Sequence, residues 1–152
     1  RIAGLPHDSV KMSVFVQQSI NADLSGVLVT INPYDIAQKN SSYIAAKRGL
    51  GIRVVEGKRI AEQVVYNRRN DSVQRLSSSN ETTALQLDKN GGVREVPVTS
   101  GNVMNQEQIR RLDQTGQQIK QLFANGEQDI EWAFDNGKLV ILQARPYLNG
   151  TR

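Results

Sequence analysis

Residues 128–146 read QDIEWAFDNGKLVILQARP, and this stretch decides the fold. Two runs of strand-forming residues flank Asp135-Asn136-Gly137, a combination typical of the tight turn in a β-hairpin. Side chains alternate between the two faces of a strand, so three large apolar residues share one face and two acidic residues share the other. The apolar residues are Ile130, Trp132 and Phe134, and the acidic ones are Asp129 and Glu131.

The length of the turn determines which residues the second strand adds to each face. A two-residue Asn-Gly turn places Gln143 on the apolar face. A three-residue turn, with Gly137 in the left-handed conformation, pairs Phe134 with Lys138 and sets Asp129 opposite Gln143 on the polar face. Register follows the face that must be buried. We therefore predict the three-residue turn.

The predicted polar face carries two carboxylates, one amide and one guanidinium, from Asp129, Glu131, Gln143 and Arg145. Hard cations such as Mg²⁺ take oxygen ligands and keep substrate phosphates in their coordination shell. Arginine binds phosphate oxygens through paired donors. These residue types together indicate a metal–phosphate site. The alternative is an ordinary hairpin with one solvated face, which is common in antiparallel sheets.

The Gln-Asp-Ile-Glu-Trp run, a short turn and the Leu-Gln-Ala-Arg-Pro run together resemble the end of the ATP-binding domain of phosphoenolpyruvate synthase and pyruvate phosphate dikinase. Rifampicin phosphotransferase and the glucan water dikinases share that domain. The resemblance implies an ATP-grasp fold of two subdomains, of which this chain is the C-terminal one. It also implies that Glu131 and Gln143 hold magnesium, with Asp129 next to the metal. Arg145 would contact the nucleotide phosphates and act as a catalytic residue.

Residues 11–20 form an alternating apolar pattern that predicts a strand. The run resembles a family strand that ends at the adenine-binding hinge, which implies nucleotide binding at Gln18, Ser19 and Ile20. Ser19 stands where the family commonly has Met. The alternative is an ordinary core strand.

Five further strands are predicted, at 26–30, 43–48, 60–66, 83–87 and 93–98, and the last two form a hairpin. The pattern at 43–48 alone fits a strand or a helix, and the resemblance favours a strand. The first of the five is expected to pair antiparallel with 11–20, and Pro33 stops it. Gly49-Leu50-Gly51 could let the backbone approach a phosphate. Ile52 replaces a Glu of the family, and Glu62 lies near an acidic family position. Residues 68–75 are interpreted as a connection.

One long helix is predicted to begin at Asn105, which can cap it together with Gln108. It is predicted to end at Gly126, in the position where a left-handed residue is needed. Its apolar stripe comprises Ile109, Leu112, Gly116, Ile119, Leu122 and Phe123. Gly116 within that stripe predicts close packing against the sheet. The element order predicts an α+β fold, a mainly antiparallel sheet with one long helix packed on it.

The chain has 152 residues, enough for one domain with a core, which we expect at 1–150. The chain has a net charge of +4. Its basic residues occur as scattered pairs, so nucleic acid is not a favoured partner. The absence of cysteine excludes disulfides and thiolate metal sites. No apolar run has the length of a membrane span, and we expect a cytoplasmic protein. The chain opens at Arg1, as a piece of a longer protein would, and its one histidine, His7, is expected to be a surface residue.

The functional hypothesis is the ATP- and Mg²⁺-binding part of a phosphotransferase that phosphorylates a carrier histidine on another domain. Its partners would be an N-terminal ATP-grasp subdomain and the phosphohistidine carrier domain of the parent protein. The isolated chain is expected to be inactive, and its sequence does not reveal the phosphate acceptor. The alternative is a non-catalytic interaction module that kept the fold. A glycine-rich loop upstream of Arg1 would favour the first hypothesis.

Overall fold

A computed structural model of the chain describes residues 11, 13, 14, 16–51 and 61–148. Within these residues the chain forms eight strands and one helix. In chain order they are β1 (Leu24–Val29), β2 (Ser41–Arg48), β3 (Glu62–Asn67), β4 (Ser72–Ser77), β5 (Thr83–Leu87), β6 (Val93–Pro97), α1 (Gln106–Leu122), β7 (Gln128–Asp135) and β8 (Lys138–Pro146). The predicted α+β class with a mainly antiparallel sheet is confirmed.

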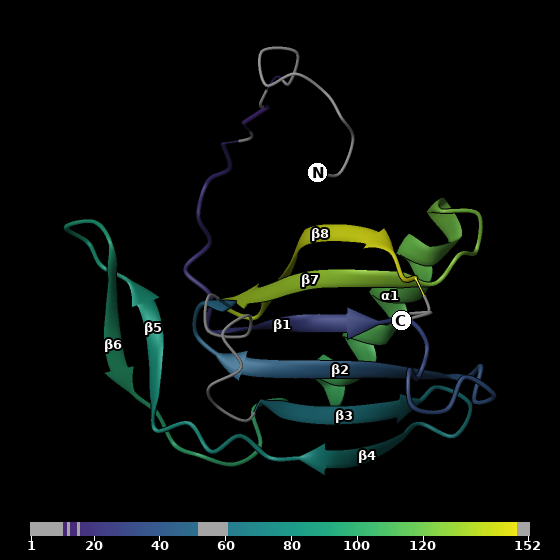
Figure 1. The fold of residues 1–152 in the computed structure, drawn as a ribbon. Helices are drawn as coiled ribbons and strands as arrows, with labels where there is room; N and C mark the ends of the chain where they lie inside the picture. The colour runs from purple at the N-terminus through teal and green to yellow at the C-terminus, as the bar shows by residue number, and fades with distance from the viewer. Residues whose placement is uncertain (1–10, 12, 15, 52–60, 149–152) are drawn as a thin grey trace, which may run out of the picture.

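Six of the strands form one antiparallel sheet in the order β4-β3-β2-β1-β7-β8. Helix α1 lies across one face of this sheet, and the β5–β6 hairpin stands as a separate two-stranded sheet to one side (Figure 1). Strand β1 is central, because β2 pairs with one of its edges and β7 with the other. Because α1 covers one face of the sheet, a site can form on the opposite face.

A row of apolar residues crosses the sheet beneath the helix. Val64, Ile44, Leu28 and Ile130 oppose one another on β3, β2, β1 and β7, and each is at most 1% exposed. The helix adds Ile109 and Leu112 to this core. A Cβ on Gly116 would lie 2.6 Å from the Leu28 Cδ2 atom, so glycine lets the helix approach the sheet closely, as predicted.

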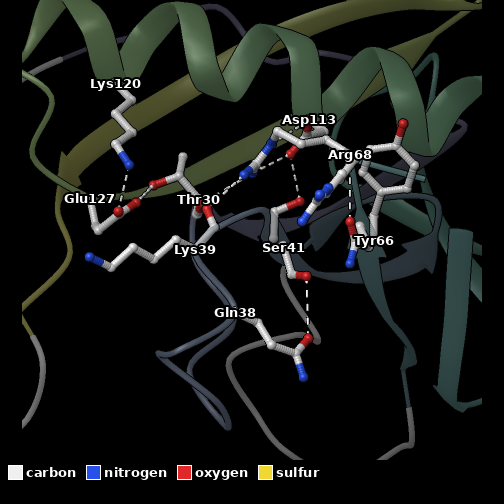
Figure 2. A network of polar contacts seen from close by, with 12 residues as sticks. Thr30, Gln38, Lys39, Ser41, Tyr66, Arg68, Asp113, Lys120 and Glu127 are labelled. Atoms are coloured by element: carbon white, nitrogen blue, oxygen red, sulfur yellow. Dashed lines mark hydrogen bonds and ion pairs between the residues drawn. The ribbon is translucent and has the colours of Figure 1, made fainter. Parts of the chain in front are cut away.

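Polar side chains fix both halves of the helix to the sheet (Figure 2). The carboxylate of Asp113 accepts a hydrogen bond from Ser42 Oγ at 2.8 Å and pairs with the Arg68 guanidinium at 2.8 Å. Beyond the C-terminal end, Glu127 accepts from Thr30 Oγ1 at 2.6 Å and pairs with Lys120. Asp113 is only 3% exposed. A carboxylate this buried needs such partners, because burial without them costs several kcal/mol.

The start of the helix agrees with the prediction and its end does not. Asn105 caps the helix and forms a capping box with Gln108. The helix ends at Leu122, and the left-handed residues are Ala124 (φ 54°) and Asn125 (φ 63°), so the prediction of a left-handed Gly126 is wrong. The apolar stripe also stops early, since Leu122 is 82% and Phe123 47% exposed.

The predicted strand at residues 11–20 is wrong for the residues that the structure describes there. None of them belongs to a strand, and Val14 and Val16 are 85% and 89% exposed. The expected partner was the segment Gly26–Thr30. Because β2 and β7 take both edges of β1, that pairing has no free edge to form on.

The strands at 43–48, 83–87 and 93–98 are confirmed within a residue or two. The strand predicted at 60–66 is present as β3, though residue 60 lies outside the described residues. Strand β4 begins within the residues that were interpreted as a connection. It is an edge strand whose residues are mostly polar and exposed, so its pattern does not indicate a strand. His7 and Ile52 lie outside the described residues. Helix α1, the one helix found there, lacks the length and hydrophobicity needed to cross a membrane.

Candidate functional site

The hairpin of β7 and β8 closes with a two-residue turn. Asp135 pairs with Lys138, and both intervening residues have positive φ, 49° at Asn136 and 75° at Gly137. Two positive φ angles are what a type I′ turn requires, and Asn-Gly is its preferred sequence. The predicted three-residue turn, with Phe134 opposite Lys138, is therefore wrong, since Phe134 pairs with Leu139.

A β-bulge on the second strand restores the polar face that this turn would otherwise disrupt. The regular register runs as far as Trp132 opposite Ile141, and the next pair is Glu131 opposite Gln143. Leu142 is thus the extra residue of the bulge, which shifts the residues beyond it by one. Asp129 therefore lies opposite Arg145, and the prediction that it lies opposite Gln143 is wrong.

Residues directly opposite on an antiparallel pair project from the same face. Asp129 and Glu131 share a face because they are two positions apart. The four polar side chains predicted to share a face do so, through a bulge that sequence reasoning did not anticipate.

The same face of the sheet contains a cavity of about 490 Å³. Glu131 and Gln143 line it, and so do Gln18, Ser19 and Ile20, so the structure brings together two of the predicted groups. The rest of the lining is largely apolar and comes from β1, β5, β7, β8 and the segments beside them. These residues are Gln17, Ala22, Ser25, Gly26, Val27, Leu50, Gly51, Leu87, Trp132, Ala133 and Leu142.

At the polar end of the cavity the described lining residues supply too few oxygen ligands for a hard cation, so a bound molecule must supply others. Glu131 offers a carboxylate and Gln143 an amide oxygen, both exposed, from positions whose Cβ atoms are typically about 4.5–5.5 Å apart. The described residues contain no group of three His, Cys, Asp or Glu that could hold a metal ion. This donor set fits Mg²⁺, which commonly binds one or two carboxylates and completes its shell with phosphate oxygens and water.

Asp129 and Arg145 form an ion pair with each other two residues farther along the strands, on the same face. Arg145 Nε and Nη2 both donate to Asp129 Oδ2, at 2.9 and 2.7 Å. These hydrogen bonds and the charge of Asp129 raise the pKa of Arg145, with a smaller contribution from the charge of Glu131. Neither residue lines the cavity. Of the four polar residues, Glu131 and Gln143 face the cavity, and Arg145 lies beside it at 63% exposure.

Two other residues singled out in the sequence have structural contacts. Gly49 has a φ of 73°, and a Cβ there would lie 2.2 Å from the carbonyl oxygen of Leu85, so the glycine accommodates β5. The fully buried Glu62 accepts hydrogen bonds from the backbone N–H groups of Val103 and Met104, at 3.0 and 2.8 Å. It anchors the segment that leads into the helix.

Sequence reasoning missed the apolar part of the lining, in particular Leu50, Leu87 and Leu142. Nothing in their local patterns distinguishes them from core residues. Leu142 reaches the cavity because it is the bulged residue, and Leu87 because β5 packs beside Gly49.

Residues 1–151 match the family model described as "Pyruvate phosphate dikinase, AMP/ATP-binding domain". A probable phosphoenolpyruvate synthase of Archaeoglobus fulgidus is 30% identical over 146 residues, which cover 94% of this chain and 19% of that protein. The phosphoenolpyruvate synthase of Pyrococcus furiosus is 31% identical over 155 residues, covering 94% and 19%. A rifampicin phosphotransferase of a Streptomyces species is 30% identical over 147 residues, covering 94% and 16%. The chain thus spans less than a fifth of the length of these relatives.

Proposed function

The chain belongs to the pyruvate phosphate dikinase AMP/ATP-binding domain family, and from this premise we propose that it forms the C-terminal half of an ATP-grasp site that holds Mg²⁺ and the phosphates of ATP. The observation that carries the proposal is the pair Glu131–Gln143, directly opposed on the wall of the cavity and two residues along the strands from Arg145 on the same face. The residues expected at the adenine-binding hinge, Gln18 to Ile20, line the same cavity.

The order of groups along β7 suits an extended nucleoside triphosphate. Ala133 lies at the apolar part of the cavity, Glu131 follows two residues away, and Asp129 with Arg145 follows after two more. Each two-residue step along a strand is about 6.8 Å, so the series spans roughly 14 Å. The base would occupy the apolar part, the metal and phosphates would lie near Glu131, and the terminal phosphate would lie toward Arg145.

In this arrangement the chain's own residues position and neutralise charge. Glu131 and Gln143 would hold the metal, whose positive charge offsets that of the phosphate oxygens. Arg145 would donate hydrogen bonds to the transferring phosphoryl group and stabilise its charge in the transition state. Asp129 holds the guanidinium in place on the sheet through two hydrogen bonds, at 2.9 and 2.7 Å.

The parent protein would use this site to phosphorylate a carrier histidine on another domain. The N-terminal ATP-grasp subdomain would supply the remaining phosphate contacts. The names of the relatives, phosphoenolpyruvate synthase and rifampicin phosphotransferase, support a phosphotransferase of this kind. The two names specify different molecules, so the proposal does not include the phosphate acceptor of this protein.

The proposal is tested by substitution in the full-length parent protein. Glu131→Ala and Arg145→Ala should abolish transfer of labelled phosphate from ATP, because the first removes a metal ligand and the second a bidentate, charge-assisted contact of about 1.5–3 kcal/mol. Both side chains are exposed, so the melting temperature should hardly change. Lys138→Ala, an exposed change at the turn of the same hairpin, is the matched control and should keep full activity.

A core substitution in the same strand gives the opposite pattern. Trp132 is fully buried and packs edge-on against Phe134, with ring centroids 5.7 Å apart. Trp132→Ala should cost about 3–5 kcal/mol of stability and lower the melting temperature, which Glu131→Ala should not do. Full transfer activity in Glu131→Ala with an unchanged melt would refute the proposal, and a non-catalytic interaction module would then be the better description.

A further inference from the structure

The β5–β6 hairpin is attached to the sheet beside the cavity. Leu50 N donates a hydrogen bond to the Leu85 carbonyl oxygen at 2.8 Å, and Gly49 forms an isolated parallel bridge with Leu85. The contact is so close that a Cβ on Gly49 would lie 2.2 Å from that oxygen. The hairpin therefore has a defined position on the sheet, and the glycine at residue 49 makes that position possible.

A second contact joins the end of β5 to the segment that precedes β1. The backbone N–H of Leu87 donates to Asn21 Oδ1 at 3.2 Å, and Asn21 directly follows Ile20. The end of β5 and the proposed hinge residues are thus held together on the same side of the cavity. Both Leu87 and Ile20 line it.

The β5–β6 hairpin is attached near Ala133, which lies in β7 between Glu131 and the turn of the β7–β8 hairpin. Ser25 is opposite Ala133, and its Oγ donates to the Gly49 carbonyl oxygen at 2.6 Å. Ala133 is two residues from Glu131 on the same face of β7, about 6.8 Å along the strand. Leu50, Leu87 and Ile20 contribute apolar lining to the same cavity, against which an aromatic base would lose its contact with water.

We infer that the β5–β6 hairpin forms a side wall of the base pocket and that Leu87 is a specificity-determining residue that packs against the base of the nucleotide. This inference rests on the proposed function, since it deepens the same site. Leu87 contacts the base and not the phosphates, so its contribution should be the same for every nucleotide that carries that base. Gly49 and Asn21 act as positioning residues, because they place the wall without contacting the nucleotide.

The test uses the full-length parent protein and two probes, AMP and ATP with Mg²⁺, measured by calorimetry. Leu87→Ala removes most of an apolar contact and should weaken the binding of both probes by about the same factor, on the order of tenfold. Leu87→Met keeps the volume and should restore binding to near the wild-type value. Glu131→Ala should weaken binding of ATP with Mg²⁺ and leave binding of AMP almost unchanged.

Val93→Ala is the matched control. Val93 is the cross-strand partner of Leu87, 48% exposed and outside the cavity lining, and its truncation should leave both affinities within about twofold. Melting of each variant verifies that the hairpin substitutions leave the fold intact.

The outcomes separate the two proposals. Equal losses for AMP and ATP in Leu87→Ala, with rescue by methionine, support the wall. If Leu87→Ala binds both probes like the wild type, or loses affinity for ATP alone, the wall is refuted while the proposed function stands. An unchanged ATP affinity in Glu131→Ala beside a loss in Leu87→Ala refutes the metal role and keeps the wall. A wild-type parent that binds neither probe refutes both.

Discussion

Ala124 carries backbone strain that a single substitution can relieve. Its φ of 54° is left-handed, a conformation that costs an L-residue with a Cβ about 1–2 kcal/mol. Ala124→Gly should therefore stabilise the chain by about 0.5–1 kcal/mol, because the relief of strain exceeds the extra entropy cost of glycine. The free energy of unfolding, measured with urea, checks this.

Gly126→Ala is the companion variant, because its φ is not positive and a Cβ there would meet its nearest neighbour, the Phe123 carbonyl oxygen, at 3.4 Å. It should change stability by less than about 0.5 kcal/mol. A larger loss in Gly126→Ala than gain in Ala124→Gly would place the left-handed residue where the sequence suggests it. The sequence is misleading here because the helix closes through a hydrogen bond from Asn125 N to Lys120 O at 3.0 Å, and that bond fixes the two residues before Gly126.

Single residues also show why the polar face was predictable and its register was not. Alternation alone puts Glu131 and Asp129 on one face, and the burial of Ile130 and Trp132 identifies that face as the polar one. The preference of Asn-Gly for a two-residue turn conflicts with the position of Gln143. Either a longer turn or a β-bulge can place Gln143 on the polar face. Which of the two forms depends on pairing between distant parts of the chain.

At the scale of elements, strands were predictable from sequence where their residues alternate, as in β7. The pattern of β2 fits a strand or a helix, and only the resemblance to the family favoured the strand. Strand β4 escaped because an edge strand exposes most of its side chains. The segment at 11–20 has a strand pattern, but its described residues pair with no strand, because pairing depends on which edges of the sheet are free. Local sequence holds no information about that. The close packing of α1 on the sheet was predicted correctly from Gly116, because a helix can approach a sheet this closely only where a side chain is missing.

The contact between α1 and β1 can be tested as a coupling between two elements. Gly116→Val should cost about 1–3 kcal/mol, because even a Cβ would lie 2.6 Å from the Leu28 Cδ2 atom. Leu28→Ala should cost about 2–5 kcal/mol through the cavity that it leaves. In the double variant the valine can use part of that cavity, so the combined loss should be smaller than the sum.

Urea unfolding of the wild type and the three variants measures this coupling. Gln118→Ala, at an exposed position of the same helix, is the control and should change stability by less than about 0.5 kcal/mol. Additive losses in the double variant would mean that Gly116 and Leu28 do not contact each other in solution.

At the scale of the whole molecule, the site is built from distant parts of one chain. Residues before β1, the end of β5 and the β7–β8 hairpin meet around one cavity, although more than 100 residues separate the first from the last. The family motif identifies the hairpin's polar residues, and the wall formed by β5 follows only from the fold.

The isolated chain should therefore fold and bind ATP poorly. Its core is complete around α1, so we expect a cooperative thermal melt. Its cavity offers Glu131 and Gln143 for the metal, and Arg145 lies beside the cavity. In our proposal the other phosphate contacts come from the N-terminal subdomain. Binding of ATP with Mg²⁺ should then be weaker than a dissociation constant of about 1 mM, or −4 kcal/mol, against micromolar binding, about −8 kcal/mol, in the parent.

Calorimetry of the isolated chain and of the parent, with magnesium present, makes the comparison, and the melt of the isolated chain is the control for folding. A micromolar dissociation constant in the isolated chain would show that this half of the site suffices. The exposed side chains of Glu131 and Gln143 would then complete the metal shell with water and phosphate alone. The dependence on a second subdomain would have to be abandoned, while the assignments of Glu131 and Leu87 could still be tested on the isolated chain itself.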